Sequence, residues 1–258
     1  MNTVISGSHG YIGSHLRTII DANCIDLKLG SNILDKNIRI NGETLIHLAA
    51  LVQVGESVKK PFSYYDTNIN GTINLLNNFG GNNFIFASTG AVEQMNSPYA
   101  ISKRVCEDII IEHCLKKNIN FTIFRFYNVI GSINNIKPTN PDGLFYALSK
   151  APENGYINVY GNDYETIDGT CIRDYVHVME ICDALKMAIS TPSNKIESLG
   201  HGKGHSVLEL INTFKQVNNI DFDIVFMNRR PGDSVISVLN NVSSYMKELY
   251  SIEEMVKL

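Results

Sequence analysis

The sequence predicts an α/β fold, in which a doubly wound parallel sheet is accompanied by a smaller domain of mixed α/β structure. Short apolar runs rich in β-forming residues alternate along the chain with segments of helical spacing. Residues 129–173 break this alternation because they are rich in Gly, Asn and Pro, which is typical of irregular structure. We expect the doubly wound domain at residues 1–128 and 174–199 and the smaller domain at residues 129–173 and 200–258.

The predicted strands and helices follow one another as they do in a doubly wound sheet. Continuous apolar runs bounded by turn residues indicate strands that are buried on both faces. Strands are expected at 3–6, 24–29, 43–50, 84–87, 121–126 and 196–199, with at most one more short strand within 33–40. Helices are expected at 11–22, 64–78, 99–117 and 178–190. In the smaller domain we expect strands at 157–160 and 222–226 and a helix opened by a capping box at Ser206–Glu209.

Composition excludes several classes of protein. The 258 residues suffice for a full core in one or two domains, and the net charge of −4 without a basic patch argues against nucleic acid or a membrane surface as partner. No apolar run approaches the roughly 20 residues of a membrane span, and the N-terminus is expected to enter a strand without a signal peptide. Five scattered cysteines without a C-x-x-C pair indicate reduced thiols in the cytoplasm. The seven histidines lack metal-ligand spacing, so no metal is predicted.

The glycine-rich turn after the first predicted strand indicates dinucleotide binding. Gly7, Gly10 and Gly13 stand between that strand and the first predicted helix. Glycines allow a tight turn and a close approach of the backbone, and the helix N-terminus would receive the pyrophosphate. A flexible loop is the alternative interpretation, but the flanking strand and helix favour a cofactor site.

Asp26, near the end of the second predicted strand, is the candidate ligand of the adenosine ribose. A carboxylate there accepts hydrogen bonds from the ribose hydroxyls and repels a 2′-phosphate, so the sequence favours NAD over NADP. Asp26 follows Gly13 by 13 residues, whereas roughly 20 are typical of this pattern. Asp35, in a predicted surface turn, is therefore its rival.

The candidate catalytic residues lie around the strand predicted at 84–87. Ser88 and Thr89 stand at its end, and Tyr99 and Lys103, at i and i+4, share one face of the next helix. We expect Lys103 to lower the pKa of Tyr99 from about 10 and so make the phenol a base for hydride chemistry on an alcohol. Thr89 would then hydrogen-bond the reacting oxygen.

A second pentapeptide, from Tyr146 to Lys150, repeats the spacing of Tyr99 and Lys103. It follows a turn at 140–143 that has no strand before it. We therefore predict that this second pair lies on an ordinary helix surface.

Five longer blocks carry a family resemblance: GSHGYIGSH (7–15), VGESVKKPFSYYDTNINGT (54–72), SPYAISK (97–103), YGNDYETIDGTCIRDYVHVMEICDAL (160–185) and RRPGD (229–233). In these blocks the chain resembles the UDP-glucose (UDP-galactose) 4-epimerases of the extended short-chain dehydrogenase/reductase family. The resemblance covers nearly the whole chain, and the long blocks are more specific than the glycine turn. It implies NAD as the cofactor, a UDP-hexose as the substrate, and transient oxidation at C4 followed by return of the hydride to the other face of the sugar.

The resemblance also assigns site residues by position, with Tyr99 as the base, Lys103 as its pKa partner and Thr89 as the assisting hydroxyl. The cofactor is expected to meet Gly7, Gly10, Tyr11, Ile12, Gly13, Asp26, Leu48, Ala49, Ala50, Val52, Thr67, Tyr99, Lys103 and Tyr127. The substrate is expected to meet Thr89, Tyr99, Asn128, Leu144, Tyr160, Arg173, Arg230, Asp233 and Ser237. Guanidinium groups suit a diphosphate because they bind phosphate oxygens in a bidentate fork. Ser237 aligns with a Tyr of the glucose-specific members, which implies room for the N-acetyl group of UDP-GlcNAc and UDP-GalNAc.

Some features depart from the family pattern. The segment between Asp26 and Glu43 is too short for the usual helix and strand, and the loop between Thr89 and Tyr99 is also shorter than usual. Val52 stands where the family often has Lys. The sequence ends at residue 258, before the last helix of the family. The chain is thus a minimal version of the fold.

Three rival interpretations remain open. A 4,6-dehydratase would need an Asp-Glu pair after the active-site Thr, where this chain has Gly90 and Ala91. A 4-keto reductase would more often use NADP, against which Asp26 argues. A non-catalytic NAD-binding sensor is the alternative from another class; the intact Tyr99 and Lys103 argue against it, and the shortened loop argues for it. The sequence is also compatible with a homodimer.

Overall fold

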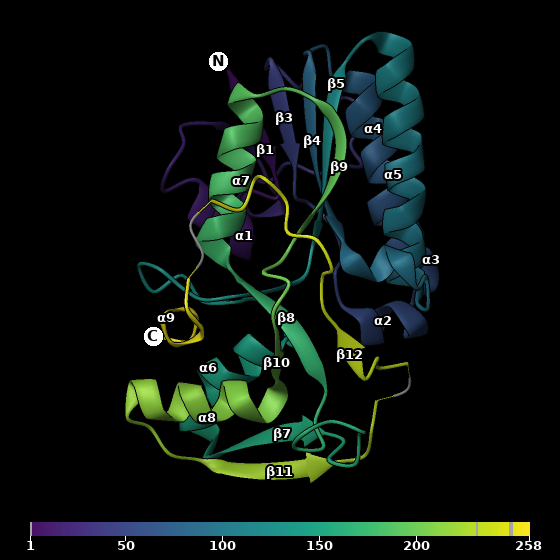
Figure 1. Cartoon of the computed structure of the whole chain (residues 1–258). Helices are drawn as coiled ribbons and strands as arrows, with labels where there is room; N and C mark the ends of the chain where they lie inside the picture. Colours follow the sequence, from purple (N-terminus) through teal and green to yellow (C-terminus); the bar gives the residue numbers. More distant parts are fainter. Residues whose placement is uncertain (1, 231, 248–249) are drawn as a thin grey trace. The chain divides into compact units, whose positions relative to one another are not determined.

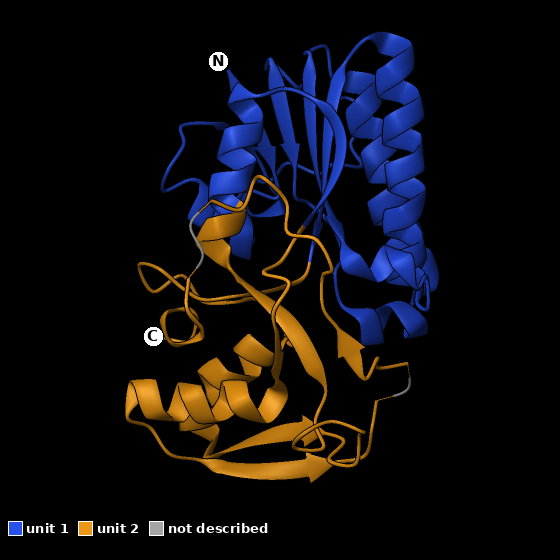
Figure 2. Cartoon of the chain, in the orientation of Figure 1, with its two compact units in different colours: residues 1–126, 182–198 blue, residues 127–181, 199–258 orange. Residues whose placement is uncertain are grey.

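The computed structural model describes residues 2–230, 232–247 and 250–258, and the chain divides into two compact units (Figure 2). Unit 1 consists of residues 1–126 and 182–198, and unit 2 consists of residues 127–181 and 199–258. Each unit has its own sheet structure and is described by itself.

Unit 1 is built on a six-stranded sheet in the order β2-β1-β3-β4-β5-β9 (Figure 1). The pairings from β2 through to β5 are all parallel. The strands are β1 Thr3–Ser6, β2 Asn23–Ile25, β3 Thr44–His47, β4 Asn83–Thr89, β5 Asn120–Phe126 and β9 Asn194–Leu199. The strand order reverses between β1 and β3, and sheets of this kind bind ligands at the carboxyl ends of the strands beside such a reversal. The predicted doubly wound fold is confirmed.

The helices of unit 1 begin and end at recognisable sequence signals. They are α1 Tyr11–Leu16, α2 Val54–Lys59, α3 Pro61–Tyr64, a π-helix at Tyr65–Asn70, α4 Gly71–Asn78 and α5 Pro98–Lys117; α7, Val178–Ser190, begins in unit 2. In α5 the Ser97 hydroxyl accepts the Ala100 amide at 3.2 Å, Pro98 occupies the first turn, and Asn118 ends the helix at φ +55°. In Figure 1, α4 and α5 lie together on one side of the sheet, and both contribute side chains to one apolar core with β3, β4 and β5.

Several predicted elements are shorter than the sequence pattern suggested. The strand expected at 24–29 ends at Ile25, because Asp26 accepts the Lys28 amide and opens a single 3₁₀ turn over Leu27–Leu29. The helix expected at 11–22 ends at Leu16, and the strand expected at 43–50 ends at His47. The helix expected at 64–78 is interrupted by the π-helix. Residues 33–40 provide only one parallel bridge, from Ile40 to Phe79, so β2 is an edge strand.

Unit 2 has mixed α/β structure, as predicted. Strand β8 (Ile172–His177) pairs in parallel with β6 (Asn128–Ile130) and β12 (Ile236–Ser237) and antiparallel to β10 (Gly204–Ser206). A separate parallel pair joins β7 (Tyr156–Tyr160) to β11 (Asp223–Met227). The helices are α6 Leu144–Asn154, α8 Val207–Asn218 and α9 Ile252–Met255, and the predicted capping box of Ser206 and Glu209 opens α8. Side chains of α6, α8 and β7 share one apolar core.

Two further observations concern the described part of the chain. No helix in it combines the length and the hydropathy that a membrane span requires. Nor does it contain a group of three or more His, Cys, Asp or Glu side chains placed to hold a metal ion.

Candidate active site

The glycine turn after β1 is folded tightly against the end of β3. Gly7 has φ +78°, and a Cβ at this position would lie 2.6 Å from the Ala49 nitrogen. A Cβ at Gly13 would collide with the carbonyl oxygen of Gly7. Both positions therefore require glycine, and the resulting cradle of bare backbone fits the close approach of a pyrophosphate. Helix α1, which carries Tyr11 and Ile12, has only six residues. For binding a pyrophosphate, the backbone amides of the turn therefore contribute more than the dipole of so short a helix.

Asp26 is tied to this turn, whereas Asp35 is not. One carboxylate oxygen of Asp26 accepts the His9 amide at 2.8 Å, and the other accepts the Lys28 amide at 3.0 Å. Asp35 is exposed in a turn, where it accepts the Asn37 amide. Of the two candidates, Asp26 is the one that the structure places beside the glycine turn.

The segment after β3 lies beside the same turn and is held by a residue that the sequence analysis missed. Leu48, Ala49 and Ala50 are half-buried and Val52 is exposed, while Thr67 lies in the π-helix. The neighbour of Thr67, Asn68, is 2 % exposed. It accepts the Leu51 amide at 2.8 Å and donates to the Leu51 carbonyl at 3.0 Å and to the Ser102 hydroxyl at 2.9 Å. Through these hydrogen bonds the Asn68 side chain joins the loop after β3 to α5. Its position within a helical segment gave no indication of this role in the sequence.

The three predicted catalytic residues come together where β4 ends and α5 begins. The Thr89 hydroxyl hydrogen-bonds Tyr99 and also accepts the Ala91 amide at 3.3 Å. The Lys103 ammonium is 3 % exposed, donates to the Ala87 carbonyl at 2.8 Å and lies 4.5 Å from the centre of the Phe86 ring. An alcohol oxygen placed beside Thr89 and Tyr99 would thus meet two hydroxyl groups and a nearby cation.

The protonation of this cluster differs from the sequence-based expectation. Burial lowers the pKa of Lys103 to about 8 and raises the pKa of Tyr99 to about 12, while the hydrogen bond from Thr89 acts to lower the pKa of Tyr99. The expectation that the pKa of Tyr99 lies below its ordinary value is wrong for this structure, because burial of the phenol outweighs the effects that lower it.

The similar pentapeptide in unit 2 lies in α6, on the surface. Lys150 pairs with Glu153 at 2.9 Å, and both side chains are more than a third exposed. Tyr146 is half-buried in the same helix. The prediction that this pair belongs to a helix surface is confirmed.

In unit 2, the residues expected to meet a substrate form two groups. In the first, Arg173 of β8 lies 3.6 Å from the Asp233 carboxylate and donates to the Ser234 carbonyl at 2.7 Å. Ser237 of β12 stands opposite Arg173 in the strand register. In β6, Asn128, which follows Tyr127, donates to the Asp174 carbonyl at 2.9 Å.

The second group gathers around Arg230. Its guanidinium stacks 3.8 Å from the centre of the Tyr160 ring and donates to the Asp142 carbonyl at 3.4 Å. Leu144 is the first residue of α6, two positions after Asp142. Pro231, in the block that contains Arg230, lies outside the described residues. Arg230 and Tyr160 thus form a cationic, aromatic surface suited to a nucleotide phosphate.

Asp174 is a second residue that the sequence analysis missed as a structural anchor. It is fully buried, and its carboxylate accepts the amides of His201 at 2.7 Å, Gly202 at 2.8 Å and Leu239 at 3.1 Å. These bonds fix β8 to two later loops and so fix the backbone beside Arg173. The sequence alone could not indicate this role, because the residues whose amides Asp174 accepts lie at least 27 positions away in the chain.

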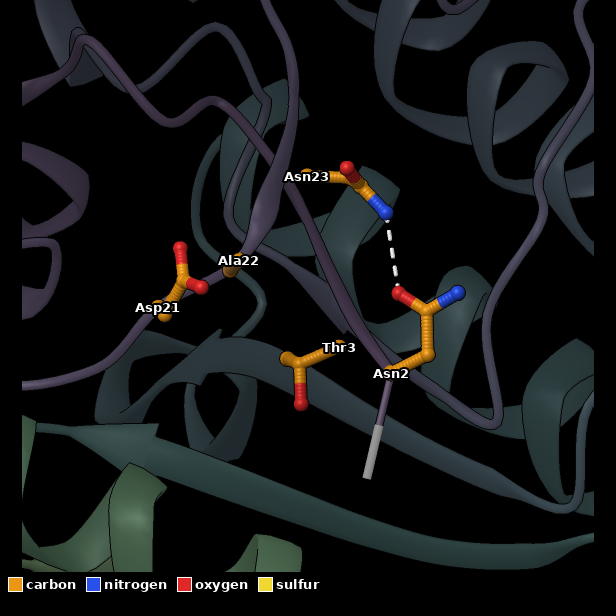
Figure 3. A pocket seen from close by; sticks show the side chains of 5 residues that line it. All are labelled: Asn2, Thr3, Asp21, Ala22 and Asn23. Carbon is orange, nitrogen blue, oxygen red and sulfur yellow. Dashed lines mark hydrogen bonds between the residues drawn. The ribbon is translucent and has the colours of Figure 1, made fainter.

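A shallow pocket lies at the opposite end of the strands from the glycine turn (Figure 3). It is lined by Asn2, Thr3, Asp21, Ala22 and Asn23, and Asn23 donates to the Asn2 side chain at 2.9 Å. Thr3 and Asn23 are the first residues of β1 and β2. The pocket contains none of the predicted site residues, and ligands of such sheets bind at the other end.

Comparison with known proteins is consistent with this arrangement. A model of the NAD dependent epimerase/dehydratase family matches residues 3–200. UDP-glucose 4-epimerase of Rhizobium meliloti is 30% identical over 292 aligned positions, covering 93% of this chain and 89% of the relative. UDP-glucose 4-epimerase of Yersinia enterocolitica is 36% identical and covers 83% and 70%. The structure of the UDP-Glc/GlcNAc 4-epimerase of Campylobacter jejuni superimposes with a TM-score of 0.79 at 25% identity, covering 99% and 97%.

Proposed function

The chain belongs to the NAD dependent epimerase/dehydratase family, and on that premise we propose that it is an NAD-dependent nucleotide-sugar 4-epimerase that interconverts UDP-hexoses. The observation that carries this proposal is the cluster of Thr89, Tyr99 and Lys103 at the end of β4. Similarity to UDP-glucose 4-epimerases, one of which aligns over 93% of this chain and 89% of its own length, supports the choice of reaction.

Unit 1 supplies the redox chemistry in this proposal. The bare backbone at Gly7 and Gly13 fits the pyrophosphate of NAD, and Asp26 is the acceptor for its ribose hydroxyls. The other proposed cofactor contacts are Gly10, Tyr11, Ile12, Leu48, Ala49, Ala50, Val52, Thr67, Tyr99, Lys103 and Tyr127. When bound, NAD supplies the acceptor and later the donor of the hydride.

Tyr99 moves the proton of the sugar's 4-hydroxyl, and Thr89 holds the same oxygen by a hydrogen bond. With a pKa of about 12, the phenol is protonated at neutral pH, so its base form requires positive charge close by. The Lys103 ammonium, already within the cluster, is the protein's source of that charge. After the 4-keto sugar has turned, Tyr99 returns the proton to the oxygen.

Unit 2 supplies the proposed contacts to the nucleotide. Arg173 and Arg230 are assigned to the diphosphate, since neither is locked into a close bidentate carboxylate pair. At 3.6 Å the pairing of Arg173 with Asp233 is loose enough to be exchanged for a phosphate oxygen. The remaining proposed contacts are Asn128, Leu144, Tyr160, Asp233 and Ser237.

The hexose specificity is proposed to extend to N-acetylated sugars. Ser237 is half-buried, and its small side chain stands beside Arg173 in the register of β12 and β8. The relative from Campylobacter jejuni is a UDP-Glc/GlcNAc 4-epimerase. We therefore assign both UDP-glucose/UDP-galactose and UDP-GlcNAc/UDP-GalNAc as substrate pairs.

The test is to assay the purified protein on UDP-galactose and UDP-GalNAc without added cofactor and to identify the products. The proposal expects the C4 epimers and NAD in the heat-released small molecules. NAD without any turnover of either sugar would instead indicate a binding protein, and a dehydrated product would indicate a 4,6-dehydratase.

A further inference from the structure

Three side chains on one face of α5 reach three consecutive residues at the end of β4. Tyr99 hydrogen-bonds Thr89, and Lys103, four residues later, donates to the Ala87 carbonyl. Glu107, four residues after Lys103, accepts the Ser88 hydroxyl at 2.5 Å. The first two of these residues belong to the proposed catalytic cluster, and Glu107 continues the same row by one turn.

Glu107 is a buried anion with a strong partner. Its side chain is 1% exposed, and Arg125 of β5 donates to it through Nη2 at 2.6 Å and through Nε at 3.0 Å. The guanidinium also lies 3.9 Å from Glu93. A carboxylate is tolerated at such a depth only when it is paired and hydrogen-bonded, and Ser88 and Arg125 meet that requirement.

The other titratable groups that face Lys103 are neutral near pH 7. Burial, followed by the charge of Lys103, lowers the pKa of His47 in β3 to about 3, so the imidazole is uncharged. Burial raises the pKa of the Cys106 thiol in α5, and burial raises the pKa of Tyr99 to about 12. Cys106 would support the charge of Lys103 only as a thiolate, a form that burial disfavours. Of the groups that act on Lys103, Glu107 is thus the one that carries negative charge.

We propose that Glu107 is a positioning residue of the reaction, which acts as the counter-charge of the Lys103 ammonium and anchors the end of β4 through Ser88. It does not touch the substrate. Its effect reaches the reacting oxygen through Lys103 and Thr89. The kinetic consequence rests on the function proposed above, whereas the electrostatic consequence holds for the protein whatever its substrate.

Glu107→Gln tests the electrostatic consequence directly, because it removes the charge and keeps the shape and the ability to accept from Ser88. The titration of Lys103 is followed by NMR on protein with isotope-labelled lysine, and its signal is assigned by its absence in Lys103→Met. The expected result is a fall in the pKa of Lys103 by about one unit, the low end of the range for the loss of a nearby opposite charge. Asp108→Asn is the matched control, because it removes the same charge one residue later, where Asp108 pairs with Arg104 at 3.4 Å on the exposed face. It should leave the Lys103 titration unchanged.

The double variant Glu107→Gln/Arg125→Gln covers the case in which the single change prevents folding, since it leaves no unpaired guanidinium. It should lower the pKa of Lys103 by less than Glu107→Gln does, because loss of the Arg125 cation acts in the opposite direction. In the epimerase assay, the alkaline limb of the pH profile of kcat/KM should shift to lower pH together with the Lys103 titration. This shift lowers kcat/KM by about tenfold above pH 8. An unshifted Lys103 titration in folded Glu107→Gln or in the double variant overturns the inference. A shifted titration in a protein that lacks epimerase activity upholds the electrostatic role of Glu107 and refutes the proposed function instead.

Discussion

Alanine at position 7 would place a Cβ 2.6 Å from the backbone nitrogen of Ala49 and 2.8 Å from its Cα. Two costs follow. The φ of +78° is left-handed, which costs a residue other than glycine about 1–2 kcal/mol, and the collision with backbone adds about 1–3 kcal/mol. Gly7→Ala should therefore lower the free energy of unfolding by about 2–5 kcal/mol, and it should also weaken NAD binding because the cradle is distorted.

Gly155 is a matched control for this prediction. It has the same φ of +78°, but a Cβ there would have no atom within 4 Å. Gly155→Ala should show only the cost of the backbone conformation, about 1–2 kcal/mol. Urea unfolding gives the stability of each variant, and calorimetric titration with NAD gives the affinity. Equal losses of stability in the two variants, together with wild-type NAD affinity in Gly7→Ala, would refute the close packing of the turn against β3 and its role as a cofactor cradle.

Four further predictions concern single side chains. Tyr99→Phe should leave folding and NAD binding nearly intact and reduce kcat by about 10²–10⁴-fold, whereas Tyr146→Phe should leave kcat unchanged. A loss of kcat in Tyr146→Phe and not in Tyr99→Phe would show that the wrong pentapeptide was chosen. Asp26→Ala should weaken NAD binding and reduce discrimination against NADP in calorimetric titrations, and unchanged affinities would remove Asp26 as the ribose ligand. Ser237→Tyr should cost about ten- to a hundredfold in kcat/KM on UDP-GalNAc and spare UDP-galactose; equal losses on both sugars would contradict a steric role. Lys103→Met should raise the free energy of unfolding at pH 7 by up to about 3 kcal/mol, from a pKa depression of 10.5 − 8 = 2.5 units at about 1.36 kcal/mol each. Between about pH 8 and 10.5, Lys103 is protonated in the unfolded wild-type protein and neutral in the folded one, so the stability of the wild type should rise with pH and the advantage of Lys103→Met should disappear. A difference in unfolding free energy between the two proteins that stays constant across that range in urea unfolding would contradict the buried charge.

The sequence was sufficient where local pattern and tertiary structure agree. The apolar run at 84–87 and the helical segment expected at 99–117 predicted β4 and α5 to within a few residues, and these two elements carry the proposed catalytic residues. The pattern misled where apolar residues are not buried. Leu27 and Leu29 extended the predicted second strand, yet they are 73% and 51% exposed in a 3₁₀ turn.

Local sequence patterns could not predict the roles of residues whose hydrogen-bond partners are distant in the chain. Asn68, Asp174 and Glu107 have their hydrogen-bond partners 17 to 65 positions away, and no spacing rule connects such positions. The protonation of Tyr99 could not be predicted from the i, i+4 rule either. That rule places Lys103 on the same helix face, but burial of the phenol outweighs the effects that lower its pKa.

The central claim, that the reaction is a reversible oxidation at C4 with the hydride kept on the protein, is tested most directly by an isotope. UDP-galactose carrying deuterium at C4 is converted by the purified protein in ordinary water without added cofactor, and the product is analysed by NMR and mass spectrometry. The account predicts UDP-glucose with the deuterium retained at C4, because the hydride removed is the hydride returned. Replacement of the deuterium by solvent hydrogen at C4 would contradict hydride transfer and would indicate proton abstraction from carbon instead.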